Sequence, residues 1–242
     1  MSRQGKTPTP EQIEIARWAA SLGAITAEAL ALRTETTVAS ARARLAVARR
    51  RGLLSRDCPL VGRPALFAVT RAGLRACGSR GIKPSEVKAS NANHLIACAV
   101  VAAALERCYP HCRVVGEKEL RRDECERGGP LPRADLGASY GGASRLHRPD
   151  LVLWPEDPDG GLPVAVEVEL TVKGRRRLVD ICRGWARCRT VAGVIYLASA
   201  DVERALSRAV AEVRAVDRIA VVPFDALPGI GALECGWKSS VD

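Results

Sequence analysis

Two apolar segments separated by a short acidic stretch constrain the fold of this chain most strongly. Leu151–Trp154 and Pro163–Leu170 are rich in Val and Leu and have the length of buried strands. Glu156–Gly161 lies between them and contains the aspartate, proline and glycine residues typical of a turn. The sequence therefore predicts a β-hairpin inside a folded domain.

Three carboxylates interrupt this apolar region. Asp150 stands where the first strand begins, and Glu167 and Glu169 lie inside the second. Carboxylates are rare in strand interiors and costly to bury alone, and residues two apart on a strand share one face. A divalent metal ion between them would offset the cost. Alternatively, Asp150 is a turn residue, and the two glutamates lie on an exposed sheet face beside arginines.

The positive charge of the chain is concentrated in its first third. Residues 1–88 hold 16 Lys and Arg against 6 Asp and Glu, which accounts for the whole net charge of +10. The remaining residues hold 21 of each sign. This asymmetry predicts two units, of which the first faces a polyanion.

The first unit has the element pattern of a winged helix-turn-helix. Thr9-Pro10 predicts a helix start, and glycines at positions 23 and 52 predict helix ends. The expected elements are three helices, two short strands and a further helix, at residues 10–22, 27–32, 38–51, 53–55, 65–69 and 71–77. We assign residues 1–80 to this domain and residues 81–93, which are rich in Gly, Ser, Lys and Asn, to a linker.

The third helix carries an apolar stripe and several arginines. In a winged helix this helix enters the major groove of double-stranded DNA, and the wing contacts the backbone or minor groove. The expected DNA contacts are therefore Arg42, Arg44 and Arg49 on the helix and Arg63 on the wing. The alternative is that these arginines form a solvated helix face.

The second unit, residues 94–242, alternates helices and strands. We expect a helix over 95–107, a strand over 113–116, a loop over 121–143, and then the hairpin. Further helices and strands are expected at 173–188, 192–198, 201–213 and 218–223. The predicted fold class is thus α/β (α+β), an N-terminal winged helix-turn-helix followed by an α-β-β-β-α-β core.

Pro149-Asp150 on one strand and Glu167-Val168-Glu169 on the next resemble the motif of the PD-(D/E)XK nuclease superfamily. The whole chain, with His94 opening the first helix of this core, is similar to the replication-relaxation family, whose members are associated with plasmid replication and mobilisation. The resemblance implies a restriction-endonuclease-like core with a Mg²⁺ ion on Asp150, Glu167 and the carbonyl of Val168.

Several other residues take their expected roles from this resemblance. Glu169 occupies the position where the superfamily normally has a catalytic lysine, and Lys173 is the candidate to supply that ammonium group. Glu117 or Glu119 would be an additional acidic ligand. Arg175 and Arg176, at the start of the following helix, would hold the DNA backbone, or alternatively form an ordinary solvated helix terminus.

Composition excludes some classes of protein. The longest apolar run has 11 residues, too short to cross a membrane, and no apolar signal region opens the chain, so a cytoplasmic location is expected. The nine cysteines favour free thiols. Cys108, His111, Cys112 and Cys125 lack the usual zinc spacing, and we favour small apolar residues around a helix end.

Two functions remain open at this point. The leading hypothesis is a DNA-binding protein with a Mg²⁺-dependent nuclease domain that works with replication or mobilisation proteins. The rival is a non-catalytic replication accessory protein or transcription regulator with a nuclease-like scaffold. The sequence indicates no oligomeric state.

Overall fold

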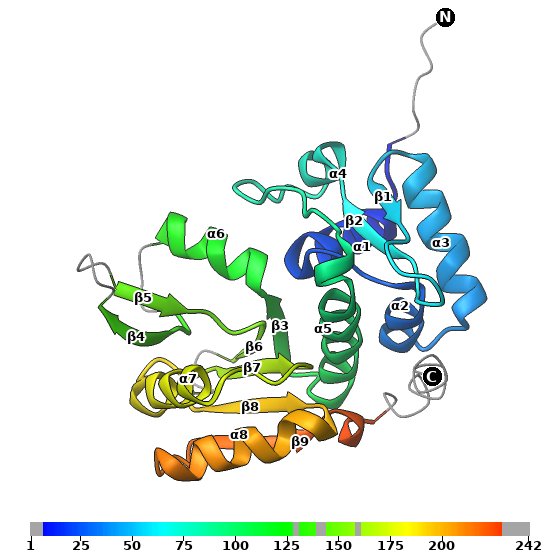
Figure 1. The fold of residues 1–242 in the computed structure, drawn as a ribbon. Helices are drawn as coiled ribbons and strands as arrows, with labels where there is room; N and C mark the ends of the chain where they lie inside the picture. Colours follow the sequence, from blue (N-terminus) through cyan, green and yellow to red (C-terminus); the bar gives the residue numbers. More distant parts are fainter. Residues whose placement is uncertain (1–6, 128–130, 139–143, 158–160, 229–242) are drawn as a thin grey trace, which may run out of the picture.

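The computed structural model describes residues 7–127, 131–138, 144–157 and 161–228, and all structural statements concern these ranges. The fold is mixed α/β, with helices at the N-terminus followed by a sheet core, as predicted (Figure 1).

The N-terminal elements follow the order expected for a winged helix. The helices are α1 (Pro10–Leu22), α2 (Ala27–Thr34), α3 (Val38–Arg50) and α4 (Arg71–Ala76), and the antiparallel strands β1 (Leu54–Asp57) and β2 (Leu66–Val69) form the hairpin. Threonine side chains cap the first turns of all four helices, and Thr9 and Gln12 form a capping box on α1.

The long helix α5 (Ala89–Cys108) begins inside the predicted linker. Residues 81–88 contain no helix or strand, but the expectation for residues 89–93 was wrong because they form the first turn of α5. The Asn91 side chain accepts a 2.8 Å hydrogen bond from the backbone N–H of Lys88. Polar residues that are typical of a linker therefore cap a helix here.

A five-stranded mixed sheet forms the core of the second unit. Its order is β3 (Cys112–Gly116), β6 (Leu151–Pro155), β7 (Val164–Glu169), β8 (Gly193–Ala198) and β9 (Ile219–Pro223). Strand β6 pairs antiparallel with both β3 and β7, whereas β8 pairs parallel with both β7 and β9. The helices α7 (Arg175–Arg187) and α8 (Ala200–Glu212) are the crossovers, and a 3₁₀ turn, Phe224–Ala226, follows β9.

The predicted loop over 121–143 was wrong for much of its length. It contains most of α6 (Glu117–Arg127) and all of β4 (Ala134–Ala138), which pairs with β5 (Ser144–His147). Helix α6 has no apolar stripe, and ion pairs such as Arg121–Glu117 lie along it instead. These elements lie between β3 and β6 along the chain, and the helices and strands of the core still follow one another in the predicted order.

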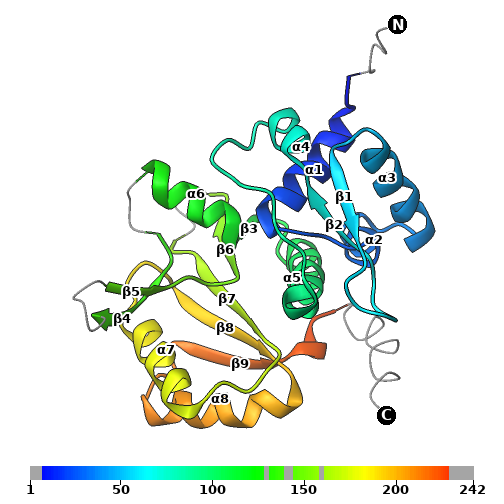
Figure 2. The same cartoon turned by 45° about the horizontal axis from the view of Figure 1, so that its top comes forward.

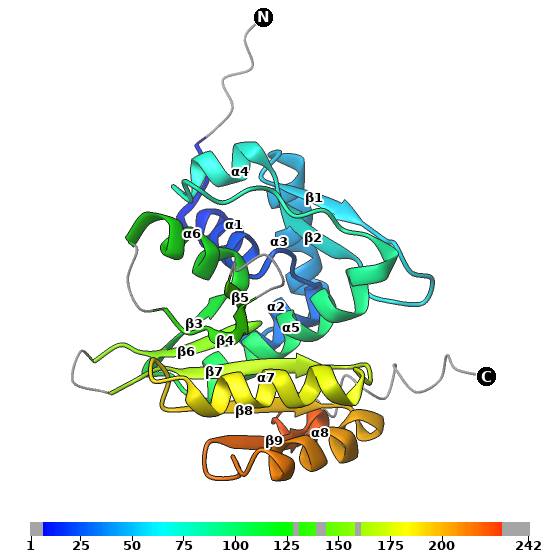
Figure 3. The same cartoon turned by 60° about the vertical axis from the view of Figure 1, so that its left-hand side comes forward.

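Helices cover both faces of the sheet. Helix α5 lies on one face, and α7 and α8 lie on the other (Figures 2 and 3). Two separate apolar clusters accordingly join α5 to β6 and β7, and α7 and α8 to β8. One apolar cluster continues from α1, α2 and α3 through α5 into the strands β6 and β7. Gly116 at the end of β3 also donates a 2.9 Å hydrogen bond to the Ser21 hydroxyl of α1. The two predicted domains therefore pack tightly together.

In the part of the chain that the structure describes, we find no helix with both the length and the apolar character needed to cross a membrane.

Candidate metal site and basic cavity

Asp150 is fixed at the start of β6 by two backbone contacts. Its Oδ2 accepts a 2.8 Å hydrogen bond from the backbone N–H of Val168 on β7. Its carbonyl accepts a 3.0 Å hydrogen bond from the N–H of Glu117. Leu151 pairs with Val166 in the antiparallel register, so the backbone of the preceding residue, Asp150, lies next to that of Glu167. The hairpin thus brings the first predicted carboxylate beside the second predicted strand.

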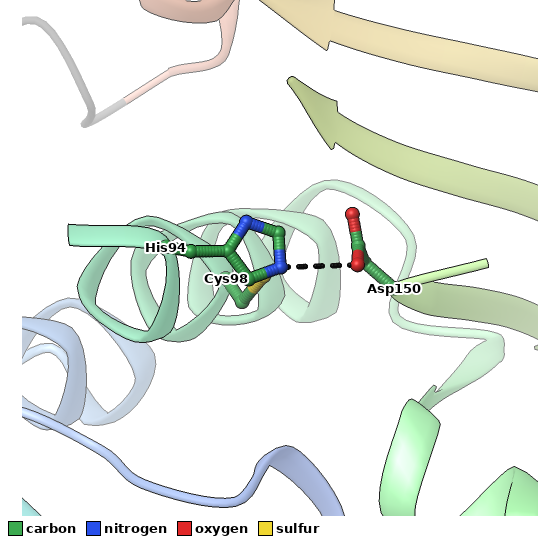
Figure 4. Close-up of side chains that lie close together, drawn as sticks. All are labelled: His94, Cys98 and Asp150. Atoms are coloured by element: carbon green, nitrogen blue, oxygen red, sulfur yellow. Dashed lines mark hydrogen bonds and ion pairs between the residues drawn. The ribbon is translucent and has the colours of Figure 1, made fainter. Parts of the chain in front are cut away.

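On the α5 side, Asp150 lies against a histidine and a cysteine (Figure 4). His94 Nε2 is 3.0 Å from Asp150 Oδ1 and 3.4 Å from Cys98 Sγ. Burial alone would lower the pKa of His94, but hydrogen bonding to Asp150 and Cys98 outweighs it and raises this pKa to about 11. Burial, followed by the charge of Asp150, raises the pKa of Cys98 to about 11.

On the α7 side, Glu167 is almost fully buried, with 4% of its surface exposed. Its Oε1 accepts hydrogen bonds from Trp185 Nε1 at 2.9 Å and from His147 Nε2 at 2.7 Å. Burial raises the pKa of Glu167, and the charge of Asp150 adds to the rise, while His147 opposes it. The effect of Asp150 on this pKa indicates that both carboxylates share one electrostatic environment.

Glu169 and Lys173 form an ion pair beside this network. Glu169 is buried, and 28% of the Lys173 side chain is exposed. The positive charge of Lys173 opposes the rise in the pKa of Glu167, so its ammonium group lies within electrostatic reach of the candidate catalytic carboxylate. The predicted residues Asp150, Glu167, Glu169 and Lys173 thus gather at one end of the hairpin.

The donor set around Asp150 differs from the predicted one. Among the described residues, the group able to offer three ligand atoms to one ion is His94, Cys98 and Asp150, with all ligand atoms within 4.8 Å of one another. Glu167 is not in this group. A Mg²⁺ ion on Asp150 and Glu167 would use hard carboxylate oxygens, as that ion prefers. The imidazole and thiol suit a softer ion.

Sequence reasoning missed Cys98 and gave His94 no chemical role. Their spacing of four residues on a helix, which places both side chains on one face, was the available signal. Glu117 and Glu119 belong to α6 and pair with arginines. Neither joins this group.

A basic cavity of about 520 Å³ lies between α2, α3 and the β1–β2 hairpin. Arg42, Arg49 and Arg63, all predicted DNA contacts, line it together with Arg56, which was not predicted. Glu28 also lines the cavity and pairs with Arg42 at 3.1 Å. The structure therefore collects four guanidinium groups from the third helix and the wing.

The other predicted DNA contacts have different surroundings. Arg44 does not line the basic cavity; it forms an ion pair with Glu11 of α1 and donates a 2.9 Å hydrogen bond to Thr34. Arg175 is highly exposed and pairs with Glu212 of α8 at 2.8 Å. Arg176 is exposed in the first turn of α7.

Comparisons of the chain with protein-family models, curated proteins and solved structures found no match.

Proposed function

We propose that this protein binds double-stranded DNA through its winged-helix unit and hydrolyses phosphodiester bonds at a metal site on the β6–β7 hairpin. The observation that carries the proposal is the hydrogen bond from Val168 to Asp150, which holds Asp150 beside the strand that contains Glu167. Two acidic positions on adjacent antiparallel strands, with Lys173 near them, are the parts that such a site needs.

The division of work among the residues follows from their contacts. A divalent ion bound by Asp150 and Glu167 would activate a water molecule and neutralise charge on the phosphate. Val168 keeps the Asp150 carboxylate in one orientation. His147 and Trp185 fix Glu167 by hydrogen bonds to one of its oxygens. Glu169 stands where a lysine is expected, and Lys173 would supply the ammonium group instead. The Nζ atom of Lys173, which follows β7, forms an ion pair with Glu169 and so lies close to that position.

The basic cavity supports the DNA-binding half of the proposal. Four arginines at the junction of α3 and the hairpin can neutralise phosphates without reading sequence, which is the contact that dominates affinity for DNA. The resemblance to the replication-relaxation family suggests plasmid DNA as the substrate and replication or mobilisation proteins as partners. We also propose a cytoplasmic location, which is the expectation from the sequence.

A plasmid-nicking assay tests this function. With Mg²⁺ or Mn²⁺ the purified chain should nick supercoiled plasmid, and Asp150→Asn should reduce the rate at least about 100-fold, since even outer-shell partners of metal ligands are worth 10–100-fold. The exposed aspartate of α8 provides the control, and Asp201→Asn should keep the wild-type rate. Equal rates for wild type and Asp150→Asn would overturn the assignment.

Two observations favour a second candidate, a non-catalytic DNA-binding scaffold. Glu167 is buried and held by two hydrogen-bond donors, and Glu169 stands where the resembled superfamily has its lysine. This candidate predicts tight DNA binding with no nicking in either metal. Nicking that depends on Asp150 would exclude it.

A further inference from the structure

The side chains of His94, Cys98 and Asp150 meet on the α5 side of the hairpin. His94 and Cys98 are one helical turn apart on α5, and Asp150 faces them from the start of β6 (Figure 4). The three residues offer one nitrogen, one sulfur and one oxygen atom, and these atoms lie within 4.8 Å of one another.

The spacing of these atoms is close to that of a tetrahedral zinc site. Zn–N and Zn–O bonds of about 2.0 Å and a Zn–S bond of about 2.3 Å separate nitrogen from oxygen by about 3.3 Å and nitrogen from sulfur by about 3.5 Å. The corresponding separations are 3.0 Å for His94–Asp150 and 3.4 Å for His94–Cys98. The third pair, Cys98 Sγ and the Asp150 carboxylate, lies within 4.8 Å, against about 3.5 Å in such a site, so a bound ion would draw these two side chains closer together.

The surroundings of the three side chains also suit a bound ion. Cys98 is buried within the long helix α5, so its side chain loses little conformational freedom when the sulfur binds an ion. The hydrogen bond from Val168 to Oδ2 fixes the Asp150 carboxylate and leaves Oδ1 directed at His94. The His94 side chain is 44% exposed, so solvent reaches the cluster from one side. A fourth ligand could enter there as water.

We propose that His94, Cys98 and Asp150 form a binding site for a borderline-soft divalent ion of the Zn²⁺ class, with an open fourth position. Mg²⁺ is a poor candidate for this site because it prefers oxygen ligands. The site shares Asp150 with the proposed nuclease centre, but its existence does not depend on DNA cleavage.

Binding of Co²⁺ to the full-length chain tests the proposal directly. Tetrahedral Co²⁺ with a thiolate ligand absorbs in the visible and near-ultraviolet regions, and Zn²⁺ should displace it at one equivalent per chain. Among the described residues, Cys58, Cys108 and Cys125 are exposed and could bind metal adventitiously. The titration therefore uses a background in which these three and Cys235, which lies outside the described residues, are replaced by Ser.

Two ligand variants and one matched control give the decisive comparison. Cys98→Ser should abolish the thiolate band, and His94→Gln should weaken Co²⁺ binding at least about 100-fold, since loss of an outer-shell partner alone costs 10–100-fold. Because His94 is partly exposed, its replacement does not disturb the core even where Cys98→Ser fails to fold. Cys182→Ser, which removes a buried thiol on α7, should leave the spectrum and the affinity unchanged.

The outcomes separate this site from the proposed nuclease. An unchanged Co²⁺ spectrum and affinity in both Cys98→Ser and His94→Gln would overturn the metal site, and so would a spectrum without a thiolate band in the wild type. Mg²⁺-dependent nicking alongside those results would leave the proposed function intact. One equivalent of Zn²⁺ on this cluster without nicking under any metal would support the site and contradict the nuclease.

Discussion

The backbone N–H of Val168 donates a 2.8 Å hydrogen bond to the Asp150 carboxylate, and this contact joins the two strands of the candidate site. It occupies Oδ2 and leaves Oδ1 facing His94 at 3.0 Å. One aspartate therefore contacts both the strand that carries Glu167 and the helix that carries Cys98. The chemistry on either side of the hairpin depends on how this single carboxylate is held.

Substitutions at Asp150 should separate its structural role from its chemical one. Asp150→Asn keeps an oxygen that can accept the Val168 N–H, whereas Asp150→Ala leaves that N–H without its acceptor. An unpaired buried donor costs about 1–3 kcal/mol, so Ala should destabilise the fold by about that much more than Asn. Urea unfolding followed by circular dichroism measures the difference. Equal stabilities of the two variants would mean that water replaces the carboxylate at Val168.

The basic cavity predicts which arginines bind DNA. Each phosphate contact contributes about −0.9 to the slope of log affinity against log salt concentration. Replacing Arg49 and Arg56 with Ala should therefore make the slope shallower by up to about 2. It should also weaken binding by a similar factor for DNA duplexes of different sequence. Fluorescence anisotropy at several salt concentrations measures both quantities.

Two controls define the DNA surface. Arg44→Ala removes the contacts with Glu11 and Thr34, so it should lower stability and leave the salt slope unchanged. Arg208→Ala, on the exposed side of α8, should alter neither. A shallower slope for Arg44→Ala with a wild-type slope for the Arg49 and Arg56 double variant would show that DNA lies on another face of α3.

Gly116 tests how closely the two units pack. A Cβ atom at this position would lie 2.3 Å from the backbone oxygen of Ser21 in α1, so Gly116→Ala must push the end of β3 away from α1. Overpacking of this kind costs about 1–3 kcal/mol. Gly174→Ala is the matched control, because no atom lies within 4 Å of its added Cβ. Thermal unfolding of both variants measures the effect, and equal melting temperatures would contradict the close approach.

The hairpin and its carboxylates were predictable because local signals agree there. Two short apolar segments, separated by residue types that favour turns, correspond to β6 and β7, and Leu151 pairs with Val166. The middle of the predicted turn, residues 158–160, lies outside the described residues. The helix cap at Thr9 was equally local, since its side chain accepts a hydrogen bond from the backbone N–H of Gln12, three residues on.

The remaining features depend on contacts between distant residues. Helix α6 buries little apolar surface apart from Leu120, so its sequence has no apolar stripe. Its many polar residues are typical of a loop, which is why a loop was predicted. The cluster of His94, Cys98 and Asp150 joins positions 56 residues apart, and no spacing rule links a helix to a strand that far along the chain. The sequence does not distinguish Arg44 from the other arginines of α3, because its ion pair with Glu11 depends on how α1 packs against α3.

Glu124 gives a prediction for the dependence of stability on pH. This residue of α6 accepts hydrogen bonds from Arg133, directly before β4, and, at 2.7 Å, from Arg148, directly after β5. Partial burial would raise the pKa of Glu124, but these two arginines outweigh it and lower the pKa below the ordinary value of 4.5. The folded protein therefore holds this proton less tightly than the unfolded chain does.

The stabilisation from Glu124 is thus complete above its unfolded pKa and is lost as the pH falls through the lower folded pKa. Glu124→Gln should reduce the free energy of unfolding by up to about 1 kcal/mol at neutral pH, and this deficit should disappear in acid. Urea unfolding at both pH values measures it. Glu126→Gln is the control, because this exposed neighbour lies 3.8 Å from Arg122, and it should change little. A deficit for Glu124→Gln that persists in acid would show that the loss comes from packing rather than from charge.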